Sequence, residues 1–266
     1  MTDDRLAAPP SAPPAAPSAI AGRRFVVTGG TRGLGAAVSR ALVRAGACVE
    51  AWYRADRASA EALAAELAGA AGELHLHAGN LVEPAEVRRV CAAILERDAR
   101  VDGLVHCAAL GSFKEMMEVR PAQWDLTVNV GARAFLLCVR ELAPALPEGG
   151  RVVALSSLGA QRVVPAYGAL GVAKAALEAL VRVLAVELAP RGIRVNALAA
   201  GPISGTSIEL HPGASELLAR ATARTPAGRL VSAEEVADLV LLLLSAQAQG
   251  LCGQVLVADG GLSLVL

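Results

Sequence analysis

The sequence predicts a single α/β domain, a Rossmann fold built on a doubly wound, parallel, seven-stranded sheet with helices on both faces. Three observations predict it. Short apolar runs alternate with helical patterns at a steady interval, which is typical of parallel βαβ units. Hydrophobic residues make up 54% of the 266 residues, enough for a sheet buried on both faces. The first predicted strand runs directly into a glycine-rich stretch and then a helix.

The individual elements follow from these periodicities. Strands are expected at residues 24–28, 48–53, 73–77, 103–107, 151–156, 194–198 and 254–257. Helices are expected at residues 34–44, 58–68, 84–99, 122–143, 170–188 and 232–246. The last helix opens with a capping box, in which Ser232 and Glu235 satisfy each other's backbone donors. Right-handed crossovers then place all the strands in one sheet.

The chain is expected to divide into a tail and one domain. Prolines, alanines and serines dominate residues 1–21 and bury too little apolar surface to offset the entropy of ordering, so we expect a disordered tail. Asp3 and Asp4 and the lack of a long apolar run argue against a signal peptide. Residues 22–266 form the predicted domain.

Composition excludes several classes of partner. The 25 basic and 25 acidic residues cancel and the arginines are scattered, so no nucleic-acid surface is expected. The strongest apolar run, residues 239–244, is far shorter than the roughly 20 residues that span a bilayer, so no membrane contact is expected. Five widely spaced cysteines without a CxxC pair suit reduced thiols, with neither a disulfide nor a metal site. We expect a cytoplasmic protein.

The segment 167–188 predicts self-association. It is apolar over most of its helical circumference, with few charged interruptions: Lys174, Glu178, Arg182 and Glu187. A helix of this kind is expected to be buried on two sides, by its own sheet and by another subunit. We therefore expect a homo-oligomer, either a dimer or a homotetramer.

The glycine-rich stretch predicts a dinucleotide site. Glycines let the backbone turn tightly and approach a pyrophosphate, whose charge sits at the N-terminus of the following helix. The strand before the stretch and the helix after it make this signal stronger than the glycines alone. The candidate binding residues are Gly29, Thr31, Arg32, Gly33, Leu34 and Gly35.

The choice of dinucleotide depends on the end of the second strand. Arg32 together with Arg54 or Arg57 can hold a 2′-phosphate between guanidinium groups, which favours NADP(H). Asp56, and more weakly Glu50, argues for NAD(H), because a carboxylate there would bond the ribose 2′-hydroxyl and repel a phosphate. We expect NADP(H).

Tyr167 and Lys174 are the strongest candidates for chemistry. They stand seven positions apart at the start of an apolar helix, in a chain with only two tyrosines and two lysines. A lysine where arginine is otherwise used suggests a compact ammonium that reaches ribose hydroxyls or lowers a neighbouring phenol's pKa. The alternative is that Lys174 only extends from a packed helix and Tyr167 fills a gap.

From about residue 24 to its C-terminus the chain resembles the short-chain dehydrogenase/reductase family. The resemblance rests on the glycine loop, on the apolar fourth strand and on Asn129, Ser156, Ser157, Tyr167 and Lys174. Most members of that family place the catalytic tyrosine four residues before the lysine, which is Leu170 here. The Tyr-x6-Lys spacing instead resembles the enoyl-acyl-carrier-protein reductase III type.

This resemblance implies conjugate reduction. NADPH would deliver hydride to the β-carbon of an enoyl thioester, and Tyr167 would hydrogen-bond the enolate oxygen. Lys174 would hold the nicotinamide ribose and lower the phenol's pKa. A phenol placed one helical turn earlier, about 5.4 Å away, suits an oxygen two carbons beyond the carbon that receives hydride.

The resemblance also assigns supporting roles. Asn129 would bend the helix before the fifth strand and support Lys174 through water. Asn80 and Leu81 would contact the adenine, and Ser157 would line the pocket or orient the substrate.

Two segments depart from the family pattern. His106 and Cys107 replace the usual pair of asparagines after the fourth strand. A structural imidazole bonded to backbone is the preferred interpretation of His106, with a proton donor as the alternative. Residues 200–229 form the expected substrate lid, in which Gly201 and Ile203 cover the nicotinamide.

Three functions stay open on the sequence alone. The first is NADPH-dependent reduction of a trans-2-enoyl thioester carried by acyl carrier protein or coenzyme A, in fatty-acid synthesis or a specialised pathway. The second is a carbonyl reductase or alcohol dehydrogenase of the same family. The third is a non-catalytic nucleotide-binding protein.

Overall fold

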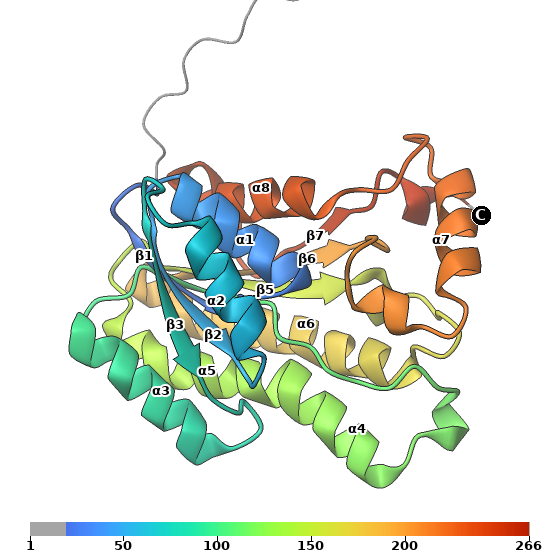
Figure 1. Ribbon diagram of the computed structural model, residues 1–266, viewed down its shortest axis with the longest axis horizontal. Helices are drawn as coiled ribbons and strands as arrows, with labels where there is room; N and C mark the ends of the chain where they lie inside the picture. Colours follow the sequence, from blue (N-terminus) through green and yellow to red (C-terminus); the bar gives the residue numbers. More distant parts are fainter. Residues whose placement is uncertain (1–19, 266) are drawn as a thin grey trace, which may run out of the picture.

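Seven parallel strands form a single sheet in the order β3-β2-β1-β4-β5-β6-β7 (Figure 1). The computed structural model describes residues 20–265 and confirms the predicted fold class. The strands are β1 (Arg24–Thr28), β2 (Cys48–Tyr53), β3 (Glu73–Ala78), β4 (Gly103–His106), β5 (Arg151–Ser157), β6 (Arg194–Ala200) and β7 (Val255–Ala258). The order reverses between β1 and β4, and such a switch point opens a crevice at the carboxyl ends of the strands.

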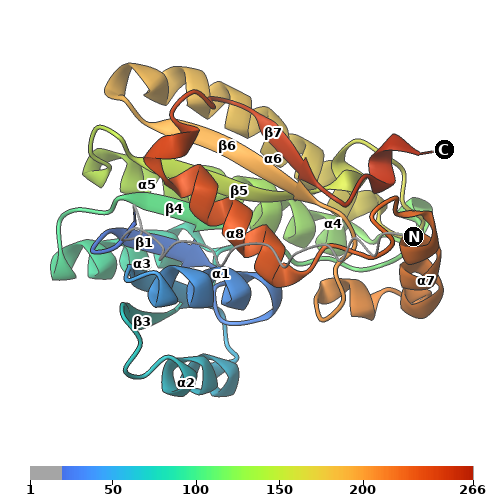
Figure 2. The same cartoon turned by 90° about the horizontal axis from the view of Figure 1, so that it is seen from above.

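Helices cover both faces of the sheet (Figure 2). On one face lie α1 (Gly33–Arg44), α2 (Arg57–Glu66) and α8 (Ala233–Leu244). On the other lie α3 (Pro84–Arg97), α5 (Ala134–Leu142) and α6 (Gly168–Leu188). The chain enters α5 through α4 (Pro121–Val128), and α7 (Ala214–Arg224) stands beyond the carboxyl ends of β5 and β6. The predicted capping box at Ser232 and Glu235 is present at the start of α8.

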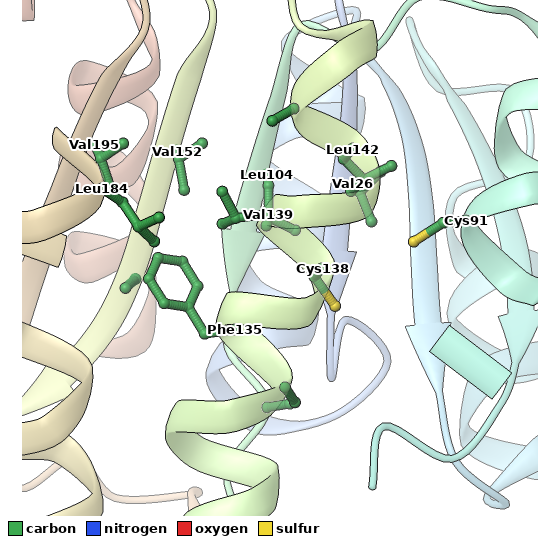
Figure 3. Packing of buried hydrophobic residues seen from close by; sticks show 14 of the residues in the cluster. Val26, Cys91, Leu104, Phe135, Cys138, Val139, Leu142, Val152, Leu184 and Val195 are labelled. Carbon is green, nitrogen blue, oxygen red and sulfur yellow. The ribbon is translucent and has the colours of Figure 1, made fainter. Parts of the chain in front are cut away.

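The core consists of two hydrophobic layers, one on each side of the sheet. Along β1, Val26 belongs to one layer and its neighbours Phe25 and Val27 to the other, as the two-residue period of a strand requires. Figure 3 shows α5 on the first layer, with Phe135 and Leu142 directed toward the sheet. Because both faces are covered, the sheet can carry apolar side chains in both directions.

A buried ion pair lies between the sheet and α3. The Arg24 guanidinium contacts Glu50 Oε1 at 2.6 Å, and the two residues are 6% and 0% exposed. Arg24 also donates to the carbonyls of Ile94 and Asp98 at the end of α3, both at 2.7 Å. The weak role in cofactor choice expected of Glu50 was wrong: the carboxylate is 0% exposed and is held by Arg24 and His77, so it is not available to bond a ribose.

The structure changes the predicted elements in three places. The helix expected at 122–143 is interrupted by a π-helical turn, Asn129–Arg133, which separates α4 from α5. The lid contains α7, which was not predicted as a helix. Ile20 is 2% exposed and packs in the α1 layer, so the ordered domain begins at least two residues before the predicted boundary at 22. The remainder of the predicted tail lies outside the described residues.

No helix within residues 20–265 is long and apolar enough to cross a membrane.

Replacing Arg24 by methionine should lower the free energy of unfolding by about 3–5 kcal/mol, because the buried Glu50 carboxylate would lose its buried arginine partner and keep only its contacts with His77 and the half-exposed Arg97. Chemical denaturation of the wild type and Arg24→Met measures this. Arg44→Met is the matched control, since Arg44 pairs with Glu66 at the surface at 3.0 Å and such pairs contribute at most about 1 kcal/mol. Equal losses in the two variants would contradict the assignment.

Candidate active site

A cleft of about 1220 Å³ opens at the carboxyl ends of the strands and extends to α7. The loops after β1 to β6 line it, so segments that are far apart in the sequence meet there. Most residues predicted to bind cofactor or act in chemistry face this cleft; Asn129 and Arg57 do not. The lining includes Gly29, Thr31, Arg32, Gly33, Leu34, Gly35, Arg54, Asn80, Leu81, Ser157, Tyr167, Lys174, Gly201 and Ile203.

The glycine loop forms a cradle that larger residues would fill. A Cβ on Gly35 would lie 2.0 Å from the carbonyl oxygen of Gly29. Gly29 itself has φ +65°, and a Cβ there would lie 3.0 Å from the Cα of Ala108. The loop leads into α1, whose first turn carries no acidic side chain. Free N–H groups at a helix N-terminus next to a glycine cradle fit the pyrophosphate of a dinucleotide.

The adenosine end of the cleft carries one ion pair. The Arg32 guanidinium lies 3.2 Å from a carboxylate oxygen of Asp56, and both side chains are substantially exposed. Asp56 also caps α2, because its carboxylate accepts from the backbone N–H of Ser59 at 3.1 Å. This backbone hydrogen bond is the main reason that the pKa of Asp56 is lowered. Asp56 is therefore ionised, and its carboxylate would compete with a cofactor 2′-phosphate for the Arg32 guanidinium.

Of the other residues predicted to bind the adenosine end of the cofactor, some line the cleft and one does not. Arg54 lines the cleft, but Arg57 pairs with Glu61 along α2 at 2.6 Å and does not. Asn80 and Leu81 line the cleft after β3, where the Asn80 side chain accepts from the N–H of Val82 at 3.2 Å. Of the two arginines weighed as partners for Arg32, Arg54 is the one in place.

Tyr167 stands at the N-terminal end of α6. Its carbonyl accepts from the N–H of Gly171 at 2.8 Å, and its ring lies so close to Gly159 that a Cβ there would meet Cε1 at 2.5 Å. Burial raises the pKa of Tyr167, and the Ser157 hydroxyl opposes that rise by hydrogen bonding. The expected lowering of this pKa by Lys174 was wrong, because burial decides the direction.

Lys174 is a buried ammonium on α6. It is 5% exposed, and its Nζ donates to the carbonyl of Leu155 on β5 at 2.5 Å. Burial lowers the pKa of Lys174 to about 8, although Cys107 and Glu178 act in the opposite direction. The lysine is therefore directed at the end of β5 and not toward solvent.

Glu178, one turn further along α6, also bonds to the end of β5. This carboxylate is 4% exposed and accepts from the Ser156 hydroxyl at 2.6 Å and from Gln161 Nε2 at 3.1 Å. It was identified in the sequence only as a polar interruption of an apolar helix. Lys174 and Glu178, on two consecutive turns of α6, therefore both bond to the end of β5.

Leu170, the family's usual tyrosine position, faces away from the cleft. Leu170 is buried, and a Cβ on Gly111 would lie 2.7 Å from its Cγ, so this side chain packs on the loop after β4. Two phenols line the cleft: Tyr53 at the end of β2 and Tyr167 at the head of α6. Of the two, Tyr167 is the one beside Ser157.

Asn129 opens the π-helical turn, as its predicted bending role requires, but does not line the cleft. Its predicted support of Lys174 through water stays a prediction. Ser157 lines the cleft, and its hydroxyl accepts from the N–H of Gly159 at 3.2 Å.

His106 is a structural imidazole, in agreement with the preferred interpretation. It is fully buried; Nε2 lies 3.1 Å from the carbonyl of Gly131, and Nδ1 lies 2.9 Å from the Thr28 hydroxyl. A carbonyl only accepts, so Nε2 carries the proton and Nδ1 accepts from Thr28. Burial, together with the charge of Lys174, lowers the pKa of His106 to about 3. Burial also raises the pKa of the neighbouring Cys107 thiol to about 12, so the sulfur stays protonated at neutral pH.

The lid closes the cleft on the α7 side. Gly201 is fixed to β7 by a bond from its N–H to the carbonyl of Ala258 at 3.0 Å, and Ile203 is 4% exposed. The Thr206 hydroxyl also lines the cleft and donates to the carbonyl of Ile203 at 2.7 Å.

The sequence did not indicate Phe113 and His211 as site residues. Their rings lie 5.5 Å apart, and the Phe113 ring lies 5.9 Å from that of Tyr167. They come from the loop after β4 and from the lid, almost a hundred positions apart. Neither belongs to a local motif, so only the fold brings them to Tyr167.

Comparison with known proteins identifies the family. Residues 29–263 match the family model described as "Enoyl-(Acyl carrier protein) reductase". A 1-cyclohexenylcarbonyl-CoA reductase of Streptomyces collinus is 35% identical, over 90% of this chain and 86% of that protein. The NADH-dependent enoyl-[acyl-carrier-protein] reductase of Bacillus subtilis is 32% identical, over 91% of this chain and 96% of that protein.

A solved structure agrees. The enoyl-acyl carrier protein reductase of Bacillus cereus, in complex with NADP+ and an indole naphthyridinone, superposes with a TM-score of 0.86 at 30% identity, covering 94% of this chain and 99% of that one. The chain belongs to the enoyl reductase-like short-chain dehydrogenases/reductases. It is therefore an oxidoreductase with a nucleotide cofactor. The glycine loop of this short-chain reductase is the part of the cleft that fits the pyrophosphate of such a cofactor.

One group of potential metal ligands lies elsewhere in this reductase. Side-chain atoms of Cys48, Glu73 and His75 come within 4.8 Å of one another at the start of β2 and β3. The Arg97 guanidinium already donates to His75 Nε2 at 2.9 Å, so a cation occupies the position that a metal would need. The group lies at the end of the strands opposite to the cleft and takes no part in the site.

The buried His106 predicts a specific loss of stability in acid. Its pKa is 6.5 when unfolded and about 3 when folded, so between these values the unfolded chain binds more protons and stability falls as the pH falls. The contribution reaches about 1.4 kcal/mol per pH unit. His106→Asn should therefore show a shallower dependence of unfolding free energy on pH between about 6.5 and 3, measured by urea denaturation.

An unchanged slope in His106→Asn would mean that the imidazole is not held neutral in the folded protein.

Proposed function

We propose that this protein catalyses NADPH-dependent reduction of the 2,3 double bond of a trans-2-enoyl thioester. One observation carries the proposal: the phenol that lines the cleft at the head of α6, hydrogen-bonded to Ser157, is that of Tyr167, while the ketone-reductase position is Leu170, packed on Gly111. The family model and the two enoyl reductases described above support the same reaction.

The chain's residues divide the work of this reaction. Bound NADPH supplies the hydride for the β-carbon. The Tyr167 hydroxyl donates a hydrogen bond to the thioester oxygen as negative charge develops on it, which is stabilisation by a preorganised donor. Because burial raises the pKa of Tyr167, the phenol stays protonated and able to donate at neutral pH. Lys174, whose Nζ donates to the carbonyl of Leu155 at the end of β5, would hold the nicotinamide ribose.

The lid supplies the apolar wall of the site. Ile203, Ile208 and Leu217 line the cleft opposite Tyr167's loop, where Val164 and Pro165 also face it. Apolar walls on both sides exclude water from the developing enolate and so strengthen its bond to the phenol.

The preference for NADPH rests on Arg32 and Arg54. Both line the cleft near the end of β2, where two guanidinium groups can bind a 2′-phosphate. Asp56 is the opposing group, since it is ionised and pairs with Arg32 at 3.2 Å. A 2′-phosphate would compete with Asp56 for Arg32. The relatives point both ways, because the B. subtilis enzyme is named for NADH and the B. cereus structure contains NADP+.

The same proposal includes a thioester carrier and a second subunit. The S. collinus relative is named for a coenzyme A ester and the B. subtilis relative for an acyl-carrier-protein ester, so either carrier fits a cytoplasmic enzyme of this type.

The proposed homo-oligomer would form through α6. On this helix Val172, Val183 and Val186 are 46%, 53% and 75% exposed, which supports an interface with a second subunit.

Tyr167→Phe should abolish most enoyl turnover while leaving cofactor affinity unchanged. Removing one oxyanion donor costs about 10²–10³ in kcat. The assay follows NADPH absorbance at 340 nm with a trans-2-enoyl thioester and with the matching 3-oxoacyl thioester, for wild type and variant.

The two substrates separate the competing functions. Turnover of the 3-oxoacyl ester alone would identify a carbonyl reductase and contradict the proposal. Nucleotide binding without turnover of either ester would favour the non-catalytic alternative.

Arg32→Ala combined with Arg54→Ala should raise the KM for NADPH at least tenfold and change the KM for NADH much less. Each arginine lost removes a charge-assisted hydrogen bond of about 1.5–3 kcal/mol to the 2′-phosphate. Steady-state kinetics with both cofactors measures the change. Arg57→Ala is the matched control, because Arg57 pairs with Glu61 outside the cleft. Equal effects on both cofactors would contradict an arginine site for the phosphate.

A further inference from the structure

We infer that His211 is a positioning residue, through which the lid holds the turn that carries Tyr167. This inference rests on the proposed role of Tyr167. Three observations carry it: the conformation of the turn before Tyr167, the two hydrogen bonds of the His211 ring, and the ring contacts that His211 and Tyr167 each make with Phe113.

The turn before Tyr167 is strained. The Tyr167 N–H donates to the carbonyl of Val164 at 3.1 Å, which closes a β-turn with Pro165 and Ala166 at its centre. Proline at the first central position and φ +53° at Ala166 make it a type II turn. That second central position normally needs glycine or asparagine. Within residues 20–265, Ala166 is the one non-glycine residue with positive φ.

A type I turn at the same four residues would remove the strain at Ala166. A type I turn has the same ends but a central peptide plane rotated by about half a turn, and its second central residue has φ near −90°, which alanine adopts readily. Rotating that plane reverses the direction of the Pro165 carbonyl. Something must therefore favour the type II orientation of the Pro165–Ala166 peptide.

His211 bonds the carbonyl that distinguishes the two turns. Its Nε2 donates to the oxygen of Pro165 at 2.9 Å. The N–H of Gly213 donates to Nδ1 at 3.0 Å, so the neutral Nε2–H form of the ring satisfies both partners. The ring thus joins the start of α7 to the turn. In the type I orientation the Pro165 carbonyl would face away, and this bond would be lost.

The same ring reaches Tyr167 by a second route. The His211 ring meets that of Phe113 at 5.5 Å between centroids, with an interplanar angle of 71°, and Phe113 meets Tyr167 at 5.9 Å. Phe113 is therefore packed between the lid histidine and the phenol. His211 acts on Tyr167 through the backbone on one side and through Phe113 on the other.

His211→Phe tests the inference, because phenylalanine keeps a ring but cannot donate to Pro165. With NADPH and the trans-2-enoyl thioester, kcat should fall about tenfold, the scale of one lost hydrogen bond, and the KM for NADPH should stay unchanged. Ala166→Gly should restore most of the lost kcat in the double variant, since glycine takes the type II turn without strain and no longer needs His211 to hold it.

His75→Phe is the matched control, because His75 lies at the start of β3, away from the cleft; its kcat should equal that of the wild type. An unchanged kcat in His211→Phe would overturn the inference. So would a loss that Ala166→Gly does not recover, since a purely structural role of His211 would not depend on residue 166.

A readout that needs no activity separates this inference from the proposed function. Trypsin should cleave after Arg220 and Arg224, which are exposed on α7, several-fold faster in His211→Phe than in the wild type, and at the wild-type rate in His75→Phe. Fragments are assigned by mass spectrometry. If the wild type turns over no enoyl thioester, the proposed function fails, and this cleavage rate decides the inference alone. Equal cleavage in His211→Phe and wild type would then overturn it.

Discussion

The burial of the Lys174 ammonium is the constraint on which the active end of the molecule depends. A charge that is 5% exposed needs a fixed partner, and the carbonyl of Leu155 at the end of β5 provides it. One turn further along α6, Glu178 accepts from Ser156 at 2.6 Å. Two adjacent polar contacts thus fix both the rotation and the depth of α6 against β5. Because Tyr167 directly precedes α6, these contacts also set the position of its backbone.

The floor of the cleft depends on a second buried group, the imidazole of His106. It bonds Thr28 on β1 and the carbonyls of the π-helical turn, so it connects the glycine-loop strand to the helix that packs behind α6. Its neutral state fits a site that already contains a buried ammonium, because a second positive charge there would have no counterion. At the position of the family's asparagine, His106 thus bonds both the Thr28 hydroxyl and the carbonyl of Gly131.

The sequence predicted what local patterns encode and missed what only the fold assembles. Strand and helix periods, the glycine loop and the Tyr167/Lys174 spacing are local, and most predicted ends agree with the structure within two residues. The contact of Phe113 with His211 depends on a lid whose course no short motif determines. The direction of the pKa shift at Tyr167 was also missed, since it depends on burial rather than on the identity of a neighbour seven positions away. The π-helical turn at Asn129 was expected only as a bend, because one extra residue in a helical turn leaves little trace in hydrophobic spacing.

The central claim is that the geometry around Tyr167 serves conjugate reduction. The most direct measurement is the position of the transferred hydrogen, with NADPH deuterated at C4 of the nicotinamide and a trans-2-enoyl thioester that also carries a remote ketone on its acyl chain. Nuclear magnetic resonance of the product should find deuterium on C3, with the ketone intact. Deuterium on the carbon of a new alcohol, with the double bond intact, would contradict the account.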